Sequence, residues 1–149
     1  MEIERKFLLH TALWDALEKP SPKKIVQAYL VNTPEKTVRV RIKGTKGYLT
    51  IKGPTKGISR SEFEYEIPLS DADALIKQFA EKVIDKDRYE LLFEGKIWEV
   101  DVFHGKLEGL LLAEIELESE DETFSVPEWI GKEVSHDEEY FNARLVEKC

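Results

Sequence analysis

The first seven residues carry two carboxylates and an ammonium group in strict alternation. Glu2, Glu4 and Lys6 occupy every second position, and side chains two residues apart on a β-strand point to the same face. Carboxylates held this close together resist joint ionisation unless a cation or a row of basic groups faces them. The row therefore predicts a cation-binding surface or, as the simpler alternative, the solvated face of an edge strand, where charged side chains prevent aggregation.

The same alternation of charged and apolar residues recurs in later segments. In TVRVRIK (37–43) basic residues alternate with Val and Ile, and a turn at GTKG (44–47) leads into a return strand. In SRSEFEYEI (59–67) mostly acidic residues alternate with aromatic and aliphatic ones. The basic members of these rows are Arg39, Arg41, Lys52, Arg60, Lys86 and Arg88, and the acidic members are Glu62, Glu64, Glu114 and Glu116, with Asp101 in the middle of its predicted strand.

The two kinds of row suit two parts of one ligand. Guanidinium and ammonium groups bind phosphate oxygens, whereas paired carboxylates suit a hard divalent cation that prefers oxygen ligands. A metal-bound polyphosphate would satisfy both rows.

The elements that carry these rows indicate an α+β protein that is mainly β. A short helix capped by Thr11 is expected near the N-terminus, and a longer one over 71–83, capped by Ser70. A last helix is expected from about Asp137. The apolar stripe of the longer helix, at the spacing typical of a buried face, is Leu75, Ile76, Phe79 and Val83.

Helices can cover only the apolar faces of such strands. An antiparallel sheet curled into a closed barrel would therefore have helices packed outside and a charged interior. Long charged side chains would then meet across the lumen, because buried charges need partners. An open sheet whose charged face is solvated and neutralised by cross-strand pairs fits the periodicity equally well.

Length and composition restrict the possibilities further. The 149 residues predict a single domain, 1–149, large enough to bury a core without cross-links. Cys149 is the only cysteine, so no disulfide is expected within the chain. A net charge of −8 argues against broad nucleic-acid binding. No run reaches transmembrane length and the start lacks an apolar leader, which favours a cytoplasmic protein.

Seven motifs in this order resemble those of CYTH-domain proteins of the triphosphate tunnel metalloenzyme superfamily. They are E-x-E-x-K (2–6), R-x-R (39–41), T-x-K (50–52), S-R-x-E-x-E (59–64), K-x-R-Y (86–89), WEVDVF (98–103) and AEIEL (113–117). The similarity runs essentially from end to end. It implies a closed eight-stranded antiparallel β-barrel that encloses a tunnel.

The resemblance also implies roles for individual residues. Mg²⁺ or Mn²⁺ would be bound by Glu2, Glu4, Glu114 and Glu116, with Asp101 as a further candidate ligand. The phosphate chain would be held by Lys6, Arg39, Arg41, Lys52, Arg60, Lys86 and Arg88. The candidate catalytic residues are Glu4, Lys6, Glu62, Glu64 and Glu116, among which the general base is not identified.

The implied reaction is the metal-dependent hydrolysis of inorganic tripolyphosphate to pyrophosphate and phosphate. Within the same family the alternatives are a class IV adenylate cyclase and a nucleoside or thiamine triphosphatase. A non-catalytic module that binds polyphosphate or nucleotides is the alternative of another class. The expected partner is a small polyanion, with no nucleic acid and no membrane, and a homodimer is compatible with the sequence.

Overall fold

One antiparallel sheet of ten strands dominates the computed structural model, which describes residues 1–149. The strands are β1 (Glu2–Leu9), β2 (Lys23–Asn32), β3 (Thr37–Lys43), β4 (Lys46–Lys52), β5 (Ser59–Arg60), β6 (Glu62–Ile67), β7 (Ile84–Phe93), β8 (Lys96–Phe103), β9 (Leu111–Glu116) and β10 (Ile130–Glu133). The helices are α1 (Thr11–Ala16), α2 (Leu69–Phe79) and α3 (Asn142–Leu145). Three short 3-10 turns complete the regular structure: η1 (Gly105–Leu107), η2 (Glu138–Tyr140) and η3 (Val146–Lys148).

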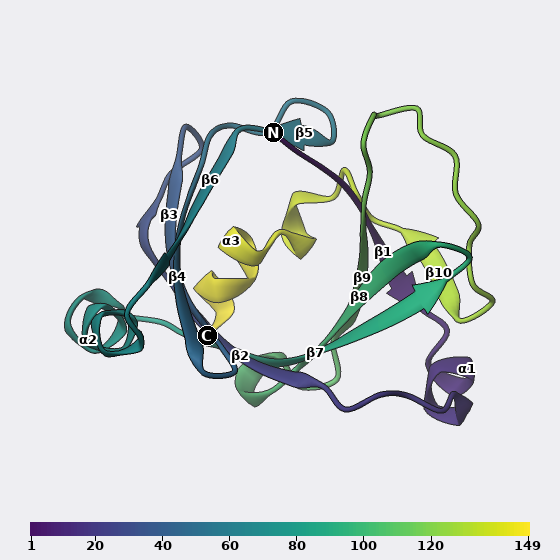
Figure 1. Cartoon of the computed structure of the whole chain (residues 1–149), viewed down its shortest axis with the longest axis horizontal. Coiled ribbons are helices and arrows are strands. Elements are labelled where there is room, and N and C mark those ends of the chain that lie inside the picture. Colours follow the sequence, from purple (N-terminus) through teal and green to yellow (C-terminus); the bar gives the residue numbers. More distant parts are fainter.

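The sheet curves around a central space (Figure 1). Its strands follow the order β10-β1-β9-β8-β7-β2-β3-β4-β6, and β5 pairs with β1 off this path. The two end strands, β10 and β6, are not paired with each other. The short β5, which directly precedes β6 in the chain, pairs with β1 and so joins the two sides of the sheet. In this pairing Arg60 lies opposite Glu2. A mainly β antiparallel fold is confirmed, but the sheet has ten strands instead of eight and is not a continuously paired barrel.

Tight turns fix the register of the two hairpins. Gly44, with φ of +61°, begins the connection between β3 and β4. Glu94 and Gly95 both have positive φ between β7 and β8, as a two-residue turn that matches the twist of its strands requires. The turn between β3 and β4 lies where the sequence predicts it.

The larger core lies on the outer face of β1, β8 and β9. It contains Phe7, Trp98 and Ile115, and α1 covers it with Trp14, whose ring packs edge-on against Trp129 at 5.5 Å. Because the apolar side chains of these strands face outward into this core, their charged side chains are left to face inward.

Helix α2 packs on the outside of β3 and β4 (Figure 1). A Cβ atom added at Gly47 would lie 2.7 Å from Ala72 Cβ, so glycine allows this close approach. The predicted cap is wrong, because Pro68 occupies the N-cap position in place of Ser70. The predicted stripe is too long, because the helix ends at Phe79, which is 63% exposed, and Val83 lies beyond the helix.

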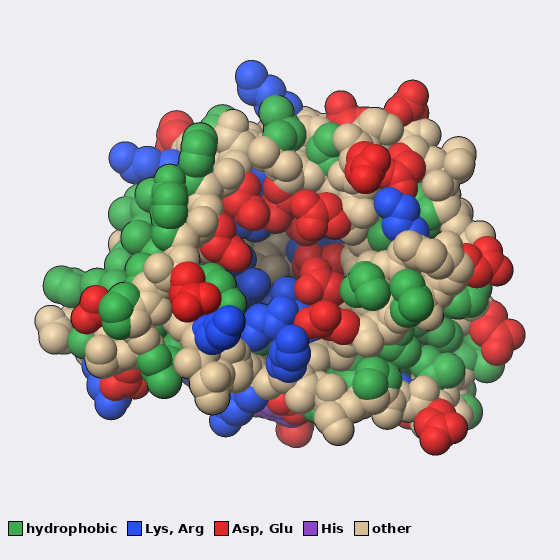
Figure 2. All heavy atoms as spheres, viewed as in Figure 1, with side chains coloured by type: hydrophobic (Ala, Val, Ile, Leu, Met, Phe, Trp, Pro, Cys, Tyr) green, Lys and Arg blue, Asp and Glu red, His purple; other side chains and the backbone are tan.

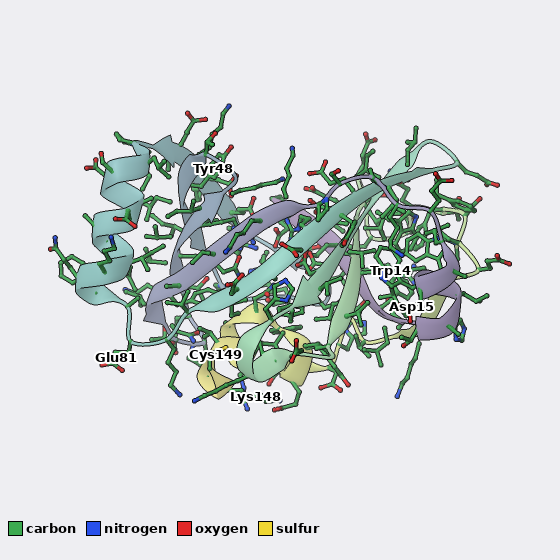
Figure 3. The ribbon with its side chains drawn as sticks, turned by 90° about the horizontal axis from the view of Figure 1, so that it is seen from below. Trp14, Asp15, Tyr48, Glu81, Lys148 and Cys149 are labelled. Carbon is green, nitrogen blue, oxygen red and sulfur yellow. The ribbon has the colours of Figure 1, made fainter.

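Helix α3 does not follow the expectation that helices pack outside. Figures 1 and 3 together place it across one end of the space inside the sheet. There the inward positions become apolar, and Phe103 and Leu112 pack with Leu145 of α3 in a second core. Thr11 is not an N-cap either, since His10 holds that position in α1. None of the helices combines the length and apolar character that crossing a membrane would need.

Candidate active site

The strand register brings the charged rows together on the inner face of the sheet. Glu4 lies opposite Glu116, and Lys6 lies opposite Glu114. Figure 2 shows a hollow in the middle of the molecule, with basic side chains along one side and acidic side chains along the other. We call this space the channel.

Two adjoining cavities make up the channel. The larger one has a volume of about 240 Å³ and the smaller one about 60 Å³. Tyr48, which lines the larger cavity, lies at the edge away from α3 (Figure 3). Five residues line both cavities: Glu2, Glu4, Arg39, Lys52 and Asn142. The larger cavity is also lined by Arg41, Lys43, Glu62, Glu64, Arg88, Glu99, Glu114 and Glu116.

The pKa values of the acidic side chains in the channel are shifted in opposite directions. Burial raises the pKa of Glu4 well above its usual range, and repulsion from Glu114 and Glu2 raises it further. Burial also raises the pKa values of Glu2 and Glu116. For Glu114 burial acts in the same direction, but the attraction of Lys6 and Arg88 outweighs it and lowers the pKa to about 2. At Glu4, burial and the repulsion from Glu114 and Glu2 together outweigh the attraction of Lys6 and Lys52.

Lys52 connects the acidic residues of β1 and β6. Its Nζ atom lies 3.0 Å from both carboxylate oxygens of Glu2 and 3.3 Å from Glu62 Oε2. Lys6 similarly lies 3.5 Å from Glu114 Oε1. Both lysines are buried or nearly so, so each reduces repulsion among the carboxylates around it.

The buried guanidinium groups are incompletely paired. Arg39 donates to Thr50 Oγ1 at 3.2 Å and Arg41 donates to Gln27 Oε1 at 2.8 Å. Burial and the neighbouring Arg39 and Arg88 lower the pKa of Arg41 to about 9. The Nε atoms of Arg39 and Arg60, both of which line the smaller cavity, have no hydrogen-bond partner. Buried donors of this kind favour a bound anion.

Asp101 lies beneath the channel and lines neither cavity. Its Oδ1 accepts from Arg88 Nε at 2.7 Å, and its Oδ2 accepts from Arg88 Nη2 at 2.9 Å and lies 2.8 Å from Lys86 Nζ. Burial alone would raise the pKa of Asp101, but these two cations hold it well below its usual range. Both carboxylate oxygens are thus engaged by basic side chains, which leaves Asp101 poorly placed as a metal ligand.

The structure brings most of the predicted site residues together. All of them line one or both cavities except Lys86 and Asp101, which form a buried pair behind the channel wall. The channel is also lined by Lys43, Tyr48 and Glu99. Each lies two residues from a residue on the predicted charged face of its strand, so the same alternation places it on that face. Asn142 lines the channel too, but no pattern in the sequence indicates it.

The carboxylates fit a hard divalent cation by their chemistry. Every candidate ligand offers oxygen, and a dication would relieve the repulsion from Glu114 and Glu2 that adds to the effect of burial on the pKa of Glu4. No group of three or more acidic, histidine or cysteine side chains is already gathered as a metal centre. Lys52 engages both oxygens of Glu2, so metal ligation by Glu2 would require that contact to change.

Comparison with known proteins agrees with this geometry. The family model described as "CYTH domain" matches residues 1–148. A protein of Acetivibrio thermocellus named inorganic triphosphatase is 47% identical over 146 residues, which cover 97% of this chain and 92% of the relative. A Nitrosomonas europaea protein of the same name is 37% identical over 149 residues, covering 97% of this chain and 95% of the relative.

Solved structures show the same relationship. The crystal structure of an inorganic triphosphatase superposes with a TM-score of 0.67 and 34% identity, covering 97% of both chains. A Pyrococcus horikoshii protein shares the fold, with a TM-score of 0.61 and 21% identity over 81% of this chain and 80% of the other. With a family model that matches nearly every residue, and a channel built from the motifs of that family, this chain belongs to the CYTH domain family.

Proposed function

We propose that this protein is a divalent-metal-dependent triphosphatase that hydrolyses inorganic tripolyphosphate to pyrophosphate and phosphate. The observation that carries the proposal is the channel itself, which holds Arg39, Arg41 and Arg88 in one cavity with Glu4, Glu114 and Glu116. The names of the two related proteins, inorganic triphosphatase, support the same substrate.

The basic side chains bind and position the phosphate chain in this proposal. Phosphoryl transfer needs neutralisation of charge on the phosphate oxygens and alignment of the attacking and leaving oxygens, with little covalent chemistry from the protein. Buried donors without partners in the protein, such as Arg39 Nε and Arg60 Nε, would gain a partner in a bound phosphate chain. The residues proposed to contact phosphate are Lys6, Arg39, Arg41, Lys52, Arg60 and Arg88.

The acidic side chains hold Mg²⁺ or Mn²⁺ in this proposal. Glu2, Glu4, Glu114 and Glu116 supply oxygen ligands, and Glu62 and Glu64 line the same cavity from β6. A bound dication neutralises charge on phosphate oxygens and lowers the pKa of a water molecule. Burial raises the pKa values of Glu4 and Glu116, and a bound dication would instead favour the ionised form of both carboxylates.

Lys86 and Asp101 act from behind the channel wall. Asp101 fixes the guanidinium plane of Arg88 through two hydrogen bonds, and Arg88 lines the larger cavity. We therefore assign Asp101 to the positioning of Arg88 in place of metal ligation. Lys86 Nζ lies 2.8 Å from Oδ2 of the same carboxylate, so Asp101 holds this ammonium group in place as well.

The proposal includes a closed tunnel and a cytoplasmic location. The pairing of β5 with β1 joins the two sides of the sheet at the N-terminal end of β1, and a closed tunnel would keep bulk water from the substrate. A chain with one cysteine needs no oxidising compartment.

Measurement of phosphate release tests the function directly. Purified protein is incubated with tripolyphosphate, ATP, thiamine triphosphate or longer polyphosphate, each with Mg²⁺, Mn²⁺ or excess chelator. The proposal expects the fastest release from tripolyphosphate with metal. Binding of tripolyphosphate without hydrolysis of any of these compounds would instead support a non-catalytic binding module.

A further inference from the structure

The chain immediately before and within α3 reaches into the inner end of the channel. The Tyr140 carbonyl oxygen accepts a hydrogen bond of 3.0 Å from Lys6 Nζ, and this ammonium group lies 5.7 Å from the centre of the Phe141 ring. Asn142 Oδ1 accepts a hydrogen bond of 3.2 Å from Lys86 Nζ. Two lysines of the channel region are thus contacted by three consecutive residues near the C-terminus.

Asn142 lies where the two cavities meet. The smaller cavity is also lined by Phe141 and Ala143, but only Asn142 of this segment lines the larger cavity as well. It shares this position with Glu2, Glu4, Arg39 and Lys52. Its side chain is therefore among the groups that a ligand spanning both cavities would contact.

The contact with Lys86 determines which end of the Asn142 amide is free. An ammonium group can only donate hydrogen bonds, so the amide atom that faces Lys86 is the oxygen. The Nδ2 group then carries two N–H donors, and it makes no hydrogen bond to another residue in the structure. The channel thus gains a neutral donor that adds no repulsion toward its guanidinium groups.

We propose that Asn142 is a further substrate-binding residue, whose Oδ1 orients Lys86 and whose Nδ2 donates a hydrogen bond to a phosphate oxygen. This inference rests on the proposed function, since it takes a linear polyphosphate as the ligand of the channel. It assigns the C-terminal segment a direct part in recognition, in addition to its apolar packing against the end of the sheet.

Two substitutions separate the donor from the acceptor. Asn142→Ala removes both, and binding of tripolyphosphate weakens about tenfold, as expected for one lost hydrogen bond to a charged group. Asn142→Asp keeps an acceptor for Lys86 but replaces the donor by an anion next to a polyanion, so affinity falls below that of the alanine variant. Affinity is measured by calorimetry with tripolyphosphate in metal-free buffer.

Asn32→Ala provides the matched control. Asn32 Nδ2 donates to the Ala143 carbonyl oxygen at 2.8 Å from an exposed position, and Asn32 lines neither channel cavity. This variant loosens the same segment without touching the channel, so it should bind tripolyphosphate like the parent. Melting temperatures of all three variants report on folding.

The outcomes distinguish this inference from the proposed function. If affinity decreases from the parent to Asn142→Ala and further to Asn142→Asp, the result supports Asn142 Nδ2 as a donor to phosphate. An aspartate variant that binds as tightly as the parent overturns it, as does an Asn32→Ala variant that binds as weakly as Asn142→Ala. A parent protein that binds tripolyphosphate but does not hydrolyse it when Mg²⁺ is added contradicts the proposed function alone, whereas a parent that binds it neither with nor without Mg²⁺ overturns both.

Discussion

Lys86 and Asp101 form an ion pair in which neither side chain is more than 3% exposed, with Nζ and Oδ2 2.8 Å apart. Burial lowers the pKa of Lys86 to about 7, although Asp101 opposes this shift. Asp101 also accepts two hydrogen bonds from Arg88. One carboxylate therefore compensates two buried cations, which makes it the most sensitive single charge behind the channel wall.

Removal of that carboxylate should destabilise the protein strongly. Asp101→Asn leaves Lys86 without its charge partner and Arg88 with only the partly exposed Glu99, and the loss of one member of a buried pair costs about 3 to 5 kcal/mol. Unfolding in urea measures the change. Glu99→Gln is the control, because Glu99 contacts Arg88 at 3.3 Å but is 34% exposed, so its loss should cost about 1 kcal/mol or less. Equal stability of Asp101→Asn and the parent would contradict this account of the pair.

The sequence was sufficient to predict which side chains face inward. Alternation in β1, β3, β4 and β9 assigns every second residue to one face, and the strand register then places Glu4 beside Glu116 and Lys6 beside Glu114. This works because a strand has only two faces, and an apolar core on one side leaves the other for charge.

Alternation does not predict which charged side chains pair with each other, nor which segment covers the end of the channel. Whether Asp101 meets a metal or a guanidinium depends on the pairing of β7 with β8, which sets it opposite Arg88. The position of α3 depends on contacts such as Lys6 with Tyr140, which are 134 residues apart. A four-residue helix has too little pattern to reveal such contacts.

An ion pair outside the channel should make stability depend on pH. Arg5 donates to both oxygens of Glu133 at 2.8 and 2.5 Å, and these hydrogen bonds lower the pKa of Glu133 below 4.5. A lowered pKa stabilises the folded state at pH values above 4.5, and this contribution is lost as pH falls through the folded-state pKa. The stability difference between the parent and Glu133→Gln should therefore shrink on acidification.

Urea unfolding at about pH 7 and about pH 3 measures this difference. Glu128→Gln is the control, because Glu128 is exposed and forms no ion pair. A difference between parent and Glu133→Gln that stays constant across this range would show that the Arg5 contact does not stabilise the fold.

Removal of metal should abolish phosphate release. Oxygen ligands favour Mg²⁺ or Mn²⁺ over softer ions, so excess chelator should stop hydrolysis and either ion should restore it. The protein should remain folded, which circular dichroism checks, because no structural metal centre is gathered in the fold. Full activity in chelator after metal stripping would eliminate the proposed role of the Glu2, Glu4, Glu114 and Glu116 carboxylates.

Tripolyphosphate should raise the melting temperature. A ligand at about a hundred times its dissociation constant adds roughly 2.7 kcal/mol to the free energy of unfolding if it binds only the folded state. Thermal unfolding with and without tripolyphosphate measures the shift, and sulfate at equal ionic strength is the control for screening. The absence of a shift at a concentration shown by calorimetry to saturate the protein would argue against binding inside the channel.

Substitutions of acidic and of basic channel residues should have different effects on affinity and turnover. Arg41→Ala and Lys52→Ala each remove a phosphate partner, so affinity and turnover both fall, by roughly 1.5 to 3 kcal/mol per contact. Glu4→Gln and Glu116→Gln keep size but remove negative charge. Their turnover should collapse, whereas metal-free binding of tripolyphosphate should persist or strengthen as repulsion of the polyanion decreases.

Calorimetry and phosphate-release kinetics on these four variants measure the two effects separately. Glu66→Gln is the matched control, because Glu66 follows the same inward alternation in β6 but lines neither cavity. Glutamine variants of Glu4 and Glu116 that turn over at the parental rate would exclude these carboxylates from the reaction. Loss of metal-free binding in those variants, with the fold intact, would contradict this division of roles between the acidic and basic residues.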